Sequence, residues 1–462
     1  MNAIIIAAVW GVVMMFGGVF FKKSTVAKYW AVAGIIILLL ANIVEFKTGK
    51  QLFKVDVKDM LRFDDFGLHF NTIVFSCTLL FFLLNGKAIE KVGSNVSEYF
   101  ALIFFILCGV AIVSSFNTLL MLFLGIEIMS IPSYILTGSD KQNLKSNEAA
   151  LKYFLMGAFS TGLMLMGIAL IYGGNDSGSF YIHMLQLGRG PLPAMTAAGL
   201  VLLVVSLSFK VSAAPFHFWA ADVYDGAPTV FTSFMATIVK VAGFIAFIDL
   251  FKASFGAIQS QWQILITIII AATLLIGNFT AVFQQSVKRM LAYSSIAHAG
   301  FMMFALFAMN NTGNEGLILY ALSYTVATMG LFAIVARMSD YSVEGFNGLY
   351  KRQPLLALAA TVFLLSLTGI PLTAGFTSKF YMLLAAVKEG HQHWLVILAV
   401  ICAAISAVYY FRVIQAIYFK EPASASNDMD VSRGFKFLLI IAIIIIIVAG
   451  VIPSLVIDWI YY

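Results

Sequence analysis

Two ionisable residues flank a proline in the apolar stretch SLSFKVSAAPFHFWAADVYDGAP, residues 206–228. An ammonium group in a hydrocarbon-facing segment costs roughly 2.5–3.5 kcal/mol, so Lys210 at such a place favours a functional role. Pro215 removes a backbone donor and should break the helix. Because His217 follows Lys210 by seven positions, nearly two helical turns, both are expected on roughly one face. There they could exchange protons with water held at the break, although a purely structural histidine is the plainer alternative.

A carboxylate, Glu127, lies within the apolar segment MLFLGIEIMSIPSY. Burial disfavours the charged form of an isolated carboxylate, and a nearby ammonium group restores it. An acid–lysine pair whose separation changes could therefore make the lysine release its proton. Lys210 and Lys152 are the candidate partners in this part of the chain, and Lys210 is favoured. The plainer alternative is an ion pair that serves only to bury two charges.

Three further lysines fall in or beside apolar segments. Lys240, in FMATIVKVAGFIAF, has no acid within a helical turn, so a proton-relay role is favoured over snorkelling to the membrane surface. Lys379 follows a second helix-breaking segment, SLTGIPLTAGFTSKF, and is interpreted in the same way. Lys152 follows Glu148 by four positions, so an ion pair at the membrane edge and a relay role are equally open.

His298 and the cysteines carry weaker signals. His298 lies in LAYSSIAHAGFMMF on a face with serines, where packing and proton transfer are equally open roles. Cys77, Cys108 and Cys402 sit in separate apolar runs without paired spacing, so neither a metal site nor a disulfide is expected. No CxxC, phosphate-binding loop or dinucleotide fingerprint occurs, so any redox cofactor is expected on a partner.

The composition places these residues in a membrane. The chain has 462 residues, of which 61% are hydrophobic and 11% charged, whereas soluble proteins carry roughly 25% charged residues. Hydropathy over windows of about 19 residues predicts an all-α integral membrane protein with about fourteen transmembrane helices. The net charge of +6 is spread over short loops and does not form the basic stripe of a nucleic-acid-binding protein.

Two of the predicted transmembrane helices, 7 and 12, are interrupted. Helix 7 breaks at Pro215, and helix 12 breaks around Gly369, Pro371 and Gly375. Paired interruptions at corresponding positions are typical of transporters built from repeats. Because the two breaks lie about five spans apart, an odd number, the repeats should be inverted relative to each other.

The repeats divide the chain into four expected segments. These are helices 1–3 in residues 1–97, a first repeat of helices 4–8 in 98–252, a second repeat of helices 9–13 in 253–420, and helix 14 in 421–462. Lysine and arginine are about twice as frequent in loops after odd-numbered spans, which predicts that both termini lie on the non-cytoplasmic side. The basic connection 47–67 runs against this orientation.

Four segments carry a family resemblance that covers roughly residues 98–420. The chain resembles the antiporter-like membrane subunits of proton-pumping NADH:quinone oxidoreductase, complex I, in LGIEIMSIPSYIL, EAALKYFLMGAFSTGLMLMGIALIYG, FKVSAAPFHFWAADVYDGAPT and VKRMLAYSSIAHAGF. Within that group, DVYDGAPT and KRMLAYSSIAH are similar to one of three paralogous branches more than to the other two.

The resemblance implies roles for the ionisable residues. Glu127 would be the carboxylate of helix 5, paired with Lys210 on broken helix 7, and His217 would lie beside the path. Lys240 would be the bridging lysine on helix 8. The remaining lysines would be Lys379 on broken helix 12, leading toward the exit side, and Lys152 on helix 6.

The resemblance also implies a place in a larger assembly. The chain would be a non-redox subunit of a proton-translocating NADH:quinone oxidoreductase in the bacterial inner membrane. NADH, FMN, iron–sulfur clusters and quinone would be bound by partner subunits, and its neighbours would be other antiporter-like and small helical membrane-arm subunits in the lipid bilayer.

Two other classes of function remain open. The chain could be a subunit of a cation/proton antiporter or of a membrane hydrogenase complex, and sodium-dependent proton movement in vesicles would identify the antiporter. It could also be a structural membrane scaffold whose buried charges serve only helix packing. Removing the charges of a scaffold should impair assembly and leave proton pumping unaffected.

Overall fold

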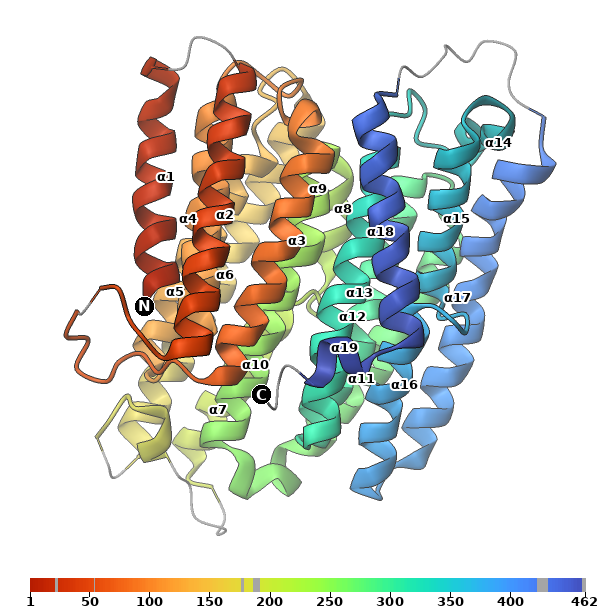
Figure 1. Ribbon diagram of the computed structural model, residues 1–462. Helices are drawn as coiled ribbons and strands as arrows, with labels where there is room; N and C mark the ends of the chain where they lie inside the picture. The colour runs from red at the N-terminus through yellow and green to blue at the C-terminus, as the bar shows by residue number, and fades with distance from the viewer. Residues whose placement is uncertain (21–23, 54, 176–177, 186–191, 422–430, 459–462) are drawn as a thin grey trace.

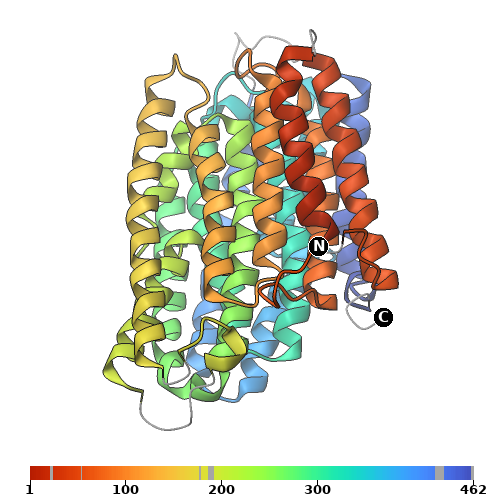
Figure 2. The same ribbon diagram turned by 90° about the vertical axis from the view of Figure 1, so that its left-hand side faces the viewer.

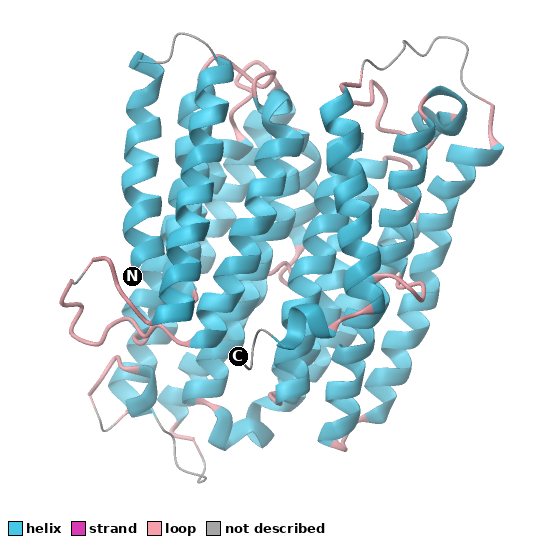
Figure 3. Ribbon diagram, viewed as in Figure 1, coloured by secondary structure: helices cyan, strands magenta, loops and turns pink. Residues whose placement is uncertain are grey.

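The computed structural model describes residues 1–20, 24–53, 55–175, 178–185, 192–421 and 431–458 (Figure 1). Its regular structure is helical, and no β-strand occurs in the described residues (Figure 3). Twelve of the described helices are long and apolar enough to cross a membrane. A helix satisfies all its backbone hydrogen bonds internally, which hydrocarbon demands. The prediction of an all-helical membrane protein is confirmed.

The helices of the N-terminal half run in the following order. They are α1 (Asn2–Phe20), α2 (Ser24–Thr48), α3 (Asp65–Ile89), α4 (Val96–Val113), α5 (Leu119–Thr137), α6 (Leu144–Gly174), η1 (Ile182–Leu185), α7 (Ala194–Lys210), α8 (Phe218–Gly226), α9 (Thr229–Phe234), η2 (Met235–Val239) and α10 (Lys240–Ser254). Of these, η1 is a single 3₁₀ turn and η2 is a π-helix that lies between α9 and α10.

The C-terminal half continues in the same manner. Its helices are η3 (Gly256–Ile258), α11 (Gln259–Val282), α12 (Val287–Ala308), α13 (Asn311–Val335), η4 (Glu344–Phe346), α14 (Leu349–Arg352), α15 (Pro354–Thr368), α16 (Ala374–Glu389), α17 (His393–Phe419), α18 (Arg433–Val451) and α19 (Ser454–Ile457).

The two halves lie side by side, with the long helices roughly parallel (Figures 1 and 2). Helices α12 and α13 are almost wholly buried, and α13 packs against both α3 and α18. Helices α6 and α17, by contrast, expose apolar side chains such as Phe159 and Ile397. A membrane protein presents such faces to lipid or to a neighbouring subunit. The buried helices α12 and α13 can therefore carry polar side chains that would be costly on a lipid-facing helix.

Side chains in the connections fix where several helices begin. Asp64 accepts a hydrogen bond from the backbone nitrogen of Gly67 at 2.8 Å, and Thr118 accepts one from Met121 at 3.2 Å. Such caps satisfy amide groups that the first helical turn leaves without a partner. In Figure 1 the start of α1 is the lower end of that helix, and the short helix α19 follows the lower end of α18.

The chain leaves the helix at both positions that the sequence identifies as breaks. Helix α7 ends at Lys210 and α8 begins at Phe218, while α15 ends at Thr368 and α16 begins at Ala374. The first break contains Pro215, which lacks a backbone donor, and the second contains Gly369 at φ +89. Residues 211–214 of the first break are buried, whereas Pro371 and Leu372 of the second break are exposed.

Candidate functional site

Glu127 and Lys210 lie together beside the first break. Glu127 projects from α5, and its Oε1 atom is 3.8 Å from the Nζ atom of Lys210, the last residue of α7. The two side chains are only 22% and 12% exposed, so their charges lie largely away from solvent. This is the pair that the sequence favours over Glu127 with Lys152.

One hydroxyl group connects the acid with the lysine, and a second contacts the lysine alone. Thr161 of α6 donates to Glu127 Oε1 at 2.7 Å, and its Oγ1 atom is 3.4 Å from Lys210 Nζ. Lys210 also donates to the Oγ atom of Ser130 at 2.9 Å. A cavity of about 20 Å³ adjoins Lys210, which is enough space for one water molecule. The ammonium group therefore has stabilising partners with and without the direct ion pair.

The chain between α7 and α8 is held away from helical geometry. Ser212 has φ +61, and the backbone nitrogen of Ala214 donates to Thr273 of α11 at 2.8 Å. The peptide bond between Ala214 and Pro215 is cis. The break is thus anchored across the boundary between the two halves, and it ends the helix directly after the lysine.

His217 does not share a helical face with Lys210. The expectation that it would is wrong, because residues 211–217 are not helical and the spacing of an α-helix does not apply there. His217 is buried at the start of α8, stacks on Phe218 at 4.7 Å between ring centroids, and its Nδ1 atom has no partner among the described residues. It lies beside the break without contacting the lysine.

Lys152 belongs to a different cluster, at the middle of α8. Its Nζ atom is 2.8 Å from Glu148 and 3.1 Å from Asp222, and the opposite oxygen of Asp222 accepts from Arg289 at 2.9 Å. The ion pair with Glu148 that the sequence leaves open is present. Asp222 was missed, because nothing in its sequence neighbourhood indicates that it joins α6 to α12.

Lys240 is wholly buried at the centre of the molecule, 1% exposed. Its Nζ atom donates to both the carbonyl and the hydroxyl oxygen of Ser295, each at 2.9 Å, and lies 5.7 Å from the ring centroid of Tyr224. No ion pair to Lys240 occurs in the described part of the chain. Its charge is therefore held by dipoles and an aromatic face alone.

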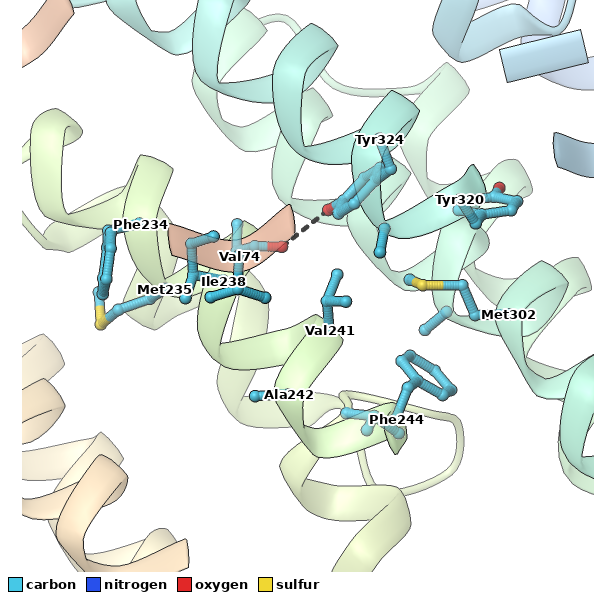
Figure 4. Packing of buried hydrophobic residues seen from close by; sticks show 14 of the residues in the cluster. Val74, Phe234, Met235, Ile238, Val241, Ala242, Phe244, Met302, Tyr320 and Tyr324 are labelled. Atoms are coloured by element: carbon cyan, nitrogen blue, oxygen red, sulfur yellow. Dashed lines mark hydrogen bonds between the residues drawn. The ribbon is translucent and has the colours of Figure 1, made fainter. Parts of the chain in front are cut away.

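The π-helix η2 comes immediately before Lys240. A π-turn displaces the backbone hydrogen-bonding ladder, and such turns are frequent at functional sites. The hydroxyl of Tyr324 donates to the carbonyl oxygen of Ala236, within η2, at 2.9 Å. In Figure 4 the hydroxyl of Tyr324 points toward this segment, whereas the side chain of Met235 lies on the far side, beside Phe234. The sequence contains no recognisable signal for this turn.

His298 is held on both sides by tyrosines. Its Nδ1 atom is 2.6 Å from the hydroxyl of Tyr320, and its Nε2 atom is 3.2 Å from that of Tyr410. Tyr410 also forms a very short contact with the hydroxyl of Ser294. The sequence identifies the serine face but misses both tyrosines, since they come from α13 and α17 and share no local motif with the histidine.

Lys379 lies just inside α16, after the second break. Its Nζ atom donates to the backbone carbonyls of Leu367 and Thr368, at 2.8 and 3.0 Å, and lies 4.8 Å from the Phe301 ring centroid. These carbonyls close α15, so the lysine occupies the negative end of that helix dipole. Gly375 allows the start of α16 to lie close to the end of α15, since a Cβ atom at this position would lie 1.8 Å from the Ser366 carbonyl oxygen.

The ionisable residues therefore form separate clusters in the described structure. One contains Glu127 and Lys210, and another contains His298 and its tyrosines, with Lys240 and Lys379 each close enough to His298 to interact electrostatically. Buried groups of this kind can each hold or release a proton. Movement of protons between the clusters would require water or a change in side-chain positions.

Comparisons with known proteins agree with this arrangement. A family described as NADH:quinone oxidoreductase/Mrp antiporter, TM, matches residues 116–406. NADH-quinone oxidoreductase subunit N of Trichlorobacter lovleyi is 36% identical, covering 98% of this chain and 94% of its own length. Subunit N 1 of Solibacter usitatus is 38% identical, covering 87% and 84%.

Solved structures share the whole fold. A chain in respiratory complex I from Thermus thermophilus with bound aureothin is 31% identical, with a TM-score of 0.84 over 99% of this chain and 98% of that one. A chain in an archaeal membrane-bound sulfane sulfur reductase is 26% identical, with a TM-score of 0.88 over 99% and 95%. The branch that DVYDGAPT and KRMLAYSSIAH favour in the sequence is subunit N rather than L or M, and the names of the relatives confirm it. The chain belongs to the NADH:quinone oxidoreductase/Mrp antiporter family of membrane subunits, in the subunit N group of NADH-quinone oxidoreductase.

Proposed function

We propose that this chain translocates protons in the membrane arm of NADH:quinone oxidoreductase, while other subunits carry electrons from NADH to quinone. Besides family membership, one observation carries the proposal. Glu127 and Lys210 form a buried ion pair at a broken helix, and the hydroxyl groups of Ser130 and Thr161 also contact the lysine. Such a pair can be opened without stranding the ammonium group, and opening it favours proton release.

The redox groups are assigned to partner subunits. NADH, FMN, the iron–sulfur clusters and quinone are bound there, and this chain acts as the non-redox, proton-translocating part of the enzyme. Its partners are other antiporter-like and small helical subunits of the membrane arm, within the bacterial inner membrane.

The architecture that we propose has fourteen spans. Twelve long helices and two broken ones, α7 with α8 and α15 with α16, together give that number. The inverted repeats comprise residues 98–252 and 253–420, flanked by segments 1–97 and 421–462. The position of a lysine beside each break supports this division. Both termini are assigned to the non-cytoplasmic side by the distribution of basic residues.

The proton-carrying groups follow one another across the chain. Lys210 is gated by Glu127, Lys240 bridges the two halves, and His298 and Lys379 follow in the second half. His217 is a further proton-carrying group beside the first break. Lys152, on α6, forms an ion pair with Asp222. Gly369, Pro371 and Gly375 shape the second break in the way that Pro215 shapes the first.

Removing either member of the first pair tests the proposal. Lys210→Ala or Glu127→Gln in the assembled complex should lower NADH-driven proton translocation by roughly tenfold or more, since a positioned acid or base contributes at least that much. The measurement is proton uptake into inverted membrane vesicles, divided by NADH oxidised. Complex content is quantified in the same membranes.

The control is Lys141→Ala, which removes an exposed lysine in the link between α5 and α6. It should leave proton uptake per NADH unchanged. Normal uptake in both pair variants, with full assembly, would contradict a proton-carrying role. Loss of assembly without loss of pumping per complex would favour a scaffold, and sodium-dependent proton movement by the chain alone would favour an antiporter.

A further inference from the structure

A cavity of about 390 Å³ lies at the end of the molecule where α1 begins and α19 ends. Its walls come from the connection between α2 and α3, the link between α4 and α5, the end of α10 and the start of α13. Polar groups line it, among them Asp249, Asn311 and Asn314. A polar space of this size holds several water molecules.

The walls of this cavity are tied together by hydrogen bonds. The backbone nitrogen of Arg62 donates to the carbonyl of Ser115 at 2.6 Å, and that of Asn117 donates to Met60 at 2.9 Å. The hydroxyl of Ser254, at the end of α10, donates to Ile182 of η1 at 3.0 Å. The cavity is therefore a built feature of the fold and not a gap between loose loops.

Asp249 is the one carboxylate in residues 229–254, an otherwise apolar span. Its neighbours Ile248 and Leu250 are buried at 1% and 0% exposure, whereas Asp249 is half-buried and lines the cavity. It has no hydrogen bond or ion pair in the described part of the chain. A carboxylate in such a span is costly unless it is used or paired.

The charged groups that face Asp249 do not neutralise it directly. They are Asp64 and Arg62 from the connection before α3 and Lys252 from α10 itself. Arg62 is already paired with Asp64 at 3.1 Å, and Asp64 also caps α3. Lys252 is exposed and forms no ion pair with Asp249 within the described residues. A structural salt bridge therefore does not account for this carboxylate.

Asp249 also lies on the same helix as Lys240. Nine positions separate them, which is roughly 13 Å along the helix axis and half a turn out of phase. Lys240 faces Ser295 of α12, and Asp249 faces the cavity. The two groups therefore lie at different depths along the helix and are not hydrogen-bond partners.

We propose that this cavity is a water-filled vestibule and that Asp249 is its proton-binding group, exchanging protons with water at the face where α1 begins. The proposal deepens the proposed function, on which it rests. The step is a plain proton transfer, in which the carboxylate takes a proton from a water-borne donor and later returns one. No electron or additional reactant is involved.

Cysteine accessibility tests the water path directly. Asp249→Cys should react with a membrane-impermeant thiosulfonate, added from the face where α1 begins, at least roughly tenfold faster than Ile248→Cys, because exposure controls thiol reactivity. Background labelling is low, because Cys77, Cys108 and Cys402 are buried. Equal, slow labelling of both variants in the assembled complex would overturn the vestibule.

Proton translocation tests the role of the carboxylate. Asp249→Asn should lower proton uptake per NADH by several-fold, Asp249→Glu should restore most of it, and Asp65→Asn, which changes an exposed acid on the same face, should have no effect. Normal uptake in Asp249→Asn would overturn the proposal. If Lys210→Ala still loses uptake in that case, the proposed function stands; if it does not, both fail.

Discussion

The two broken helices hold their lysines in different ways. Lys210, at the end of α7, lies 3.8 Å from the carboxylate of Glu127 and contacts two hydroxyl groups. Lys379, at the start of α16, donates instead to two backbone carbonyls that close α15. It takes part in no ion pair in the part of the chain that the structure describes.

The partner of Lys210 is a side chain that can move, whereas the partners of Lys379 are backbone carbonyls that are fixed. A pair of unit charges about 4 Å apart interacts by about 4 kcal/mol at the effective dielectric of a protein, and this falls quickly as the side chains part. The carbonyls at a helix end are fixed by the backbone and carry about half a charge in total. Lys210 is therefore suited to switching, and Lys379 to receiving a proton at constant geometry.

The largest expected effect comes from removing the fixed site. Lys379→Met should reduce proton uptake per NADH by at least roughly tenfold, as a missing proton carrier would. If the two sites act in series, Glu127→Gln combined with Lys379→Met should pump no worse than Lys379→Met alone. The same vesicle measurement decides this. A further, multiplicative loss in the double variant would mean that the two sites work independently.

A smaller effect is expected from the glycine that shapes the second break. Gly375→Ala would place a Cβ atom 1.8 Å from the carbonyl oxygen of Ser366, so α15 and α16 must shift, at a cost of roughly 1–3 kcal/mol. Less assembled complex and a lower thermal unfolding temperature should result. Gly162→Ala in α6 is the matched control, because nothing lies within 4 Å of its added Cβ. Equal stability of both variants would show that the break tolerates a side chain.

The smallest effect is expected from the hydroxyl that bridges the first pair. Thr161→Val keeps the shape of the side chain but removes the donor to Glu127 and a contact of Lys210. A hydrogen bond to a buried charged group is worth about 1.5–3 kcal/mol, and Lys210 keeps its contact with Ser130 in this variant. Proton uptake should fall by several-fold, and Thr161→Ser should restore it. Unchanged uptake in Thr161→Val would mean that the ion pair switches without the threonine.

Much of this organisation can be predicted from local sequence. Apolar runs of sufficient length give the membrane class, and Pro215 and Gly369 give the breaks, because both effects act within one segment. The pairing of Glu127 with Lys210 can be predicted because few lysines are available in this part of the chain to neutralise a buried acid. Motifs such as DVYDGAPT identify the branch of the family.

Other features depend on contacts between distant segments. The expected common face of Lys210 and His217 fails because helical spacing ends where the helix ends. Tyr320 and Tyr410 meet His298 only after α13 and α17 pack against α12, and Asp222 meets Lys152 and Arg289 only when α8 lies between them. No spacing rule along the chain covers such separations.

By itself, the sequence determined that this chain is a helical membrane protein with buried charges and two broken helices, because hydropathy and proline geometry are local properties. Only the tertiary structure decided the partners of the other buried groups. It placed Lys379 at a helix end and His298 between two tyrosines, and it opened a cavity beside Asp249. The reason is physical: a buried charge is stabilised by whatever dipoles surround it, and helices far apart in the chain supply those dipoles.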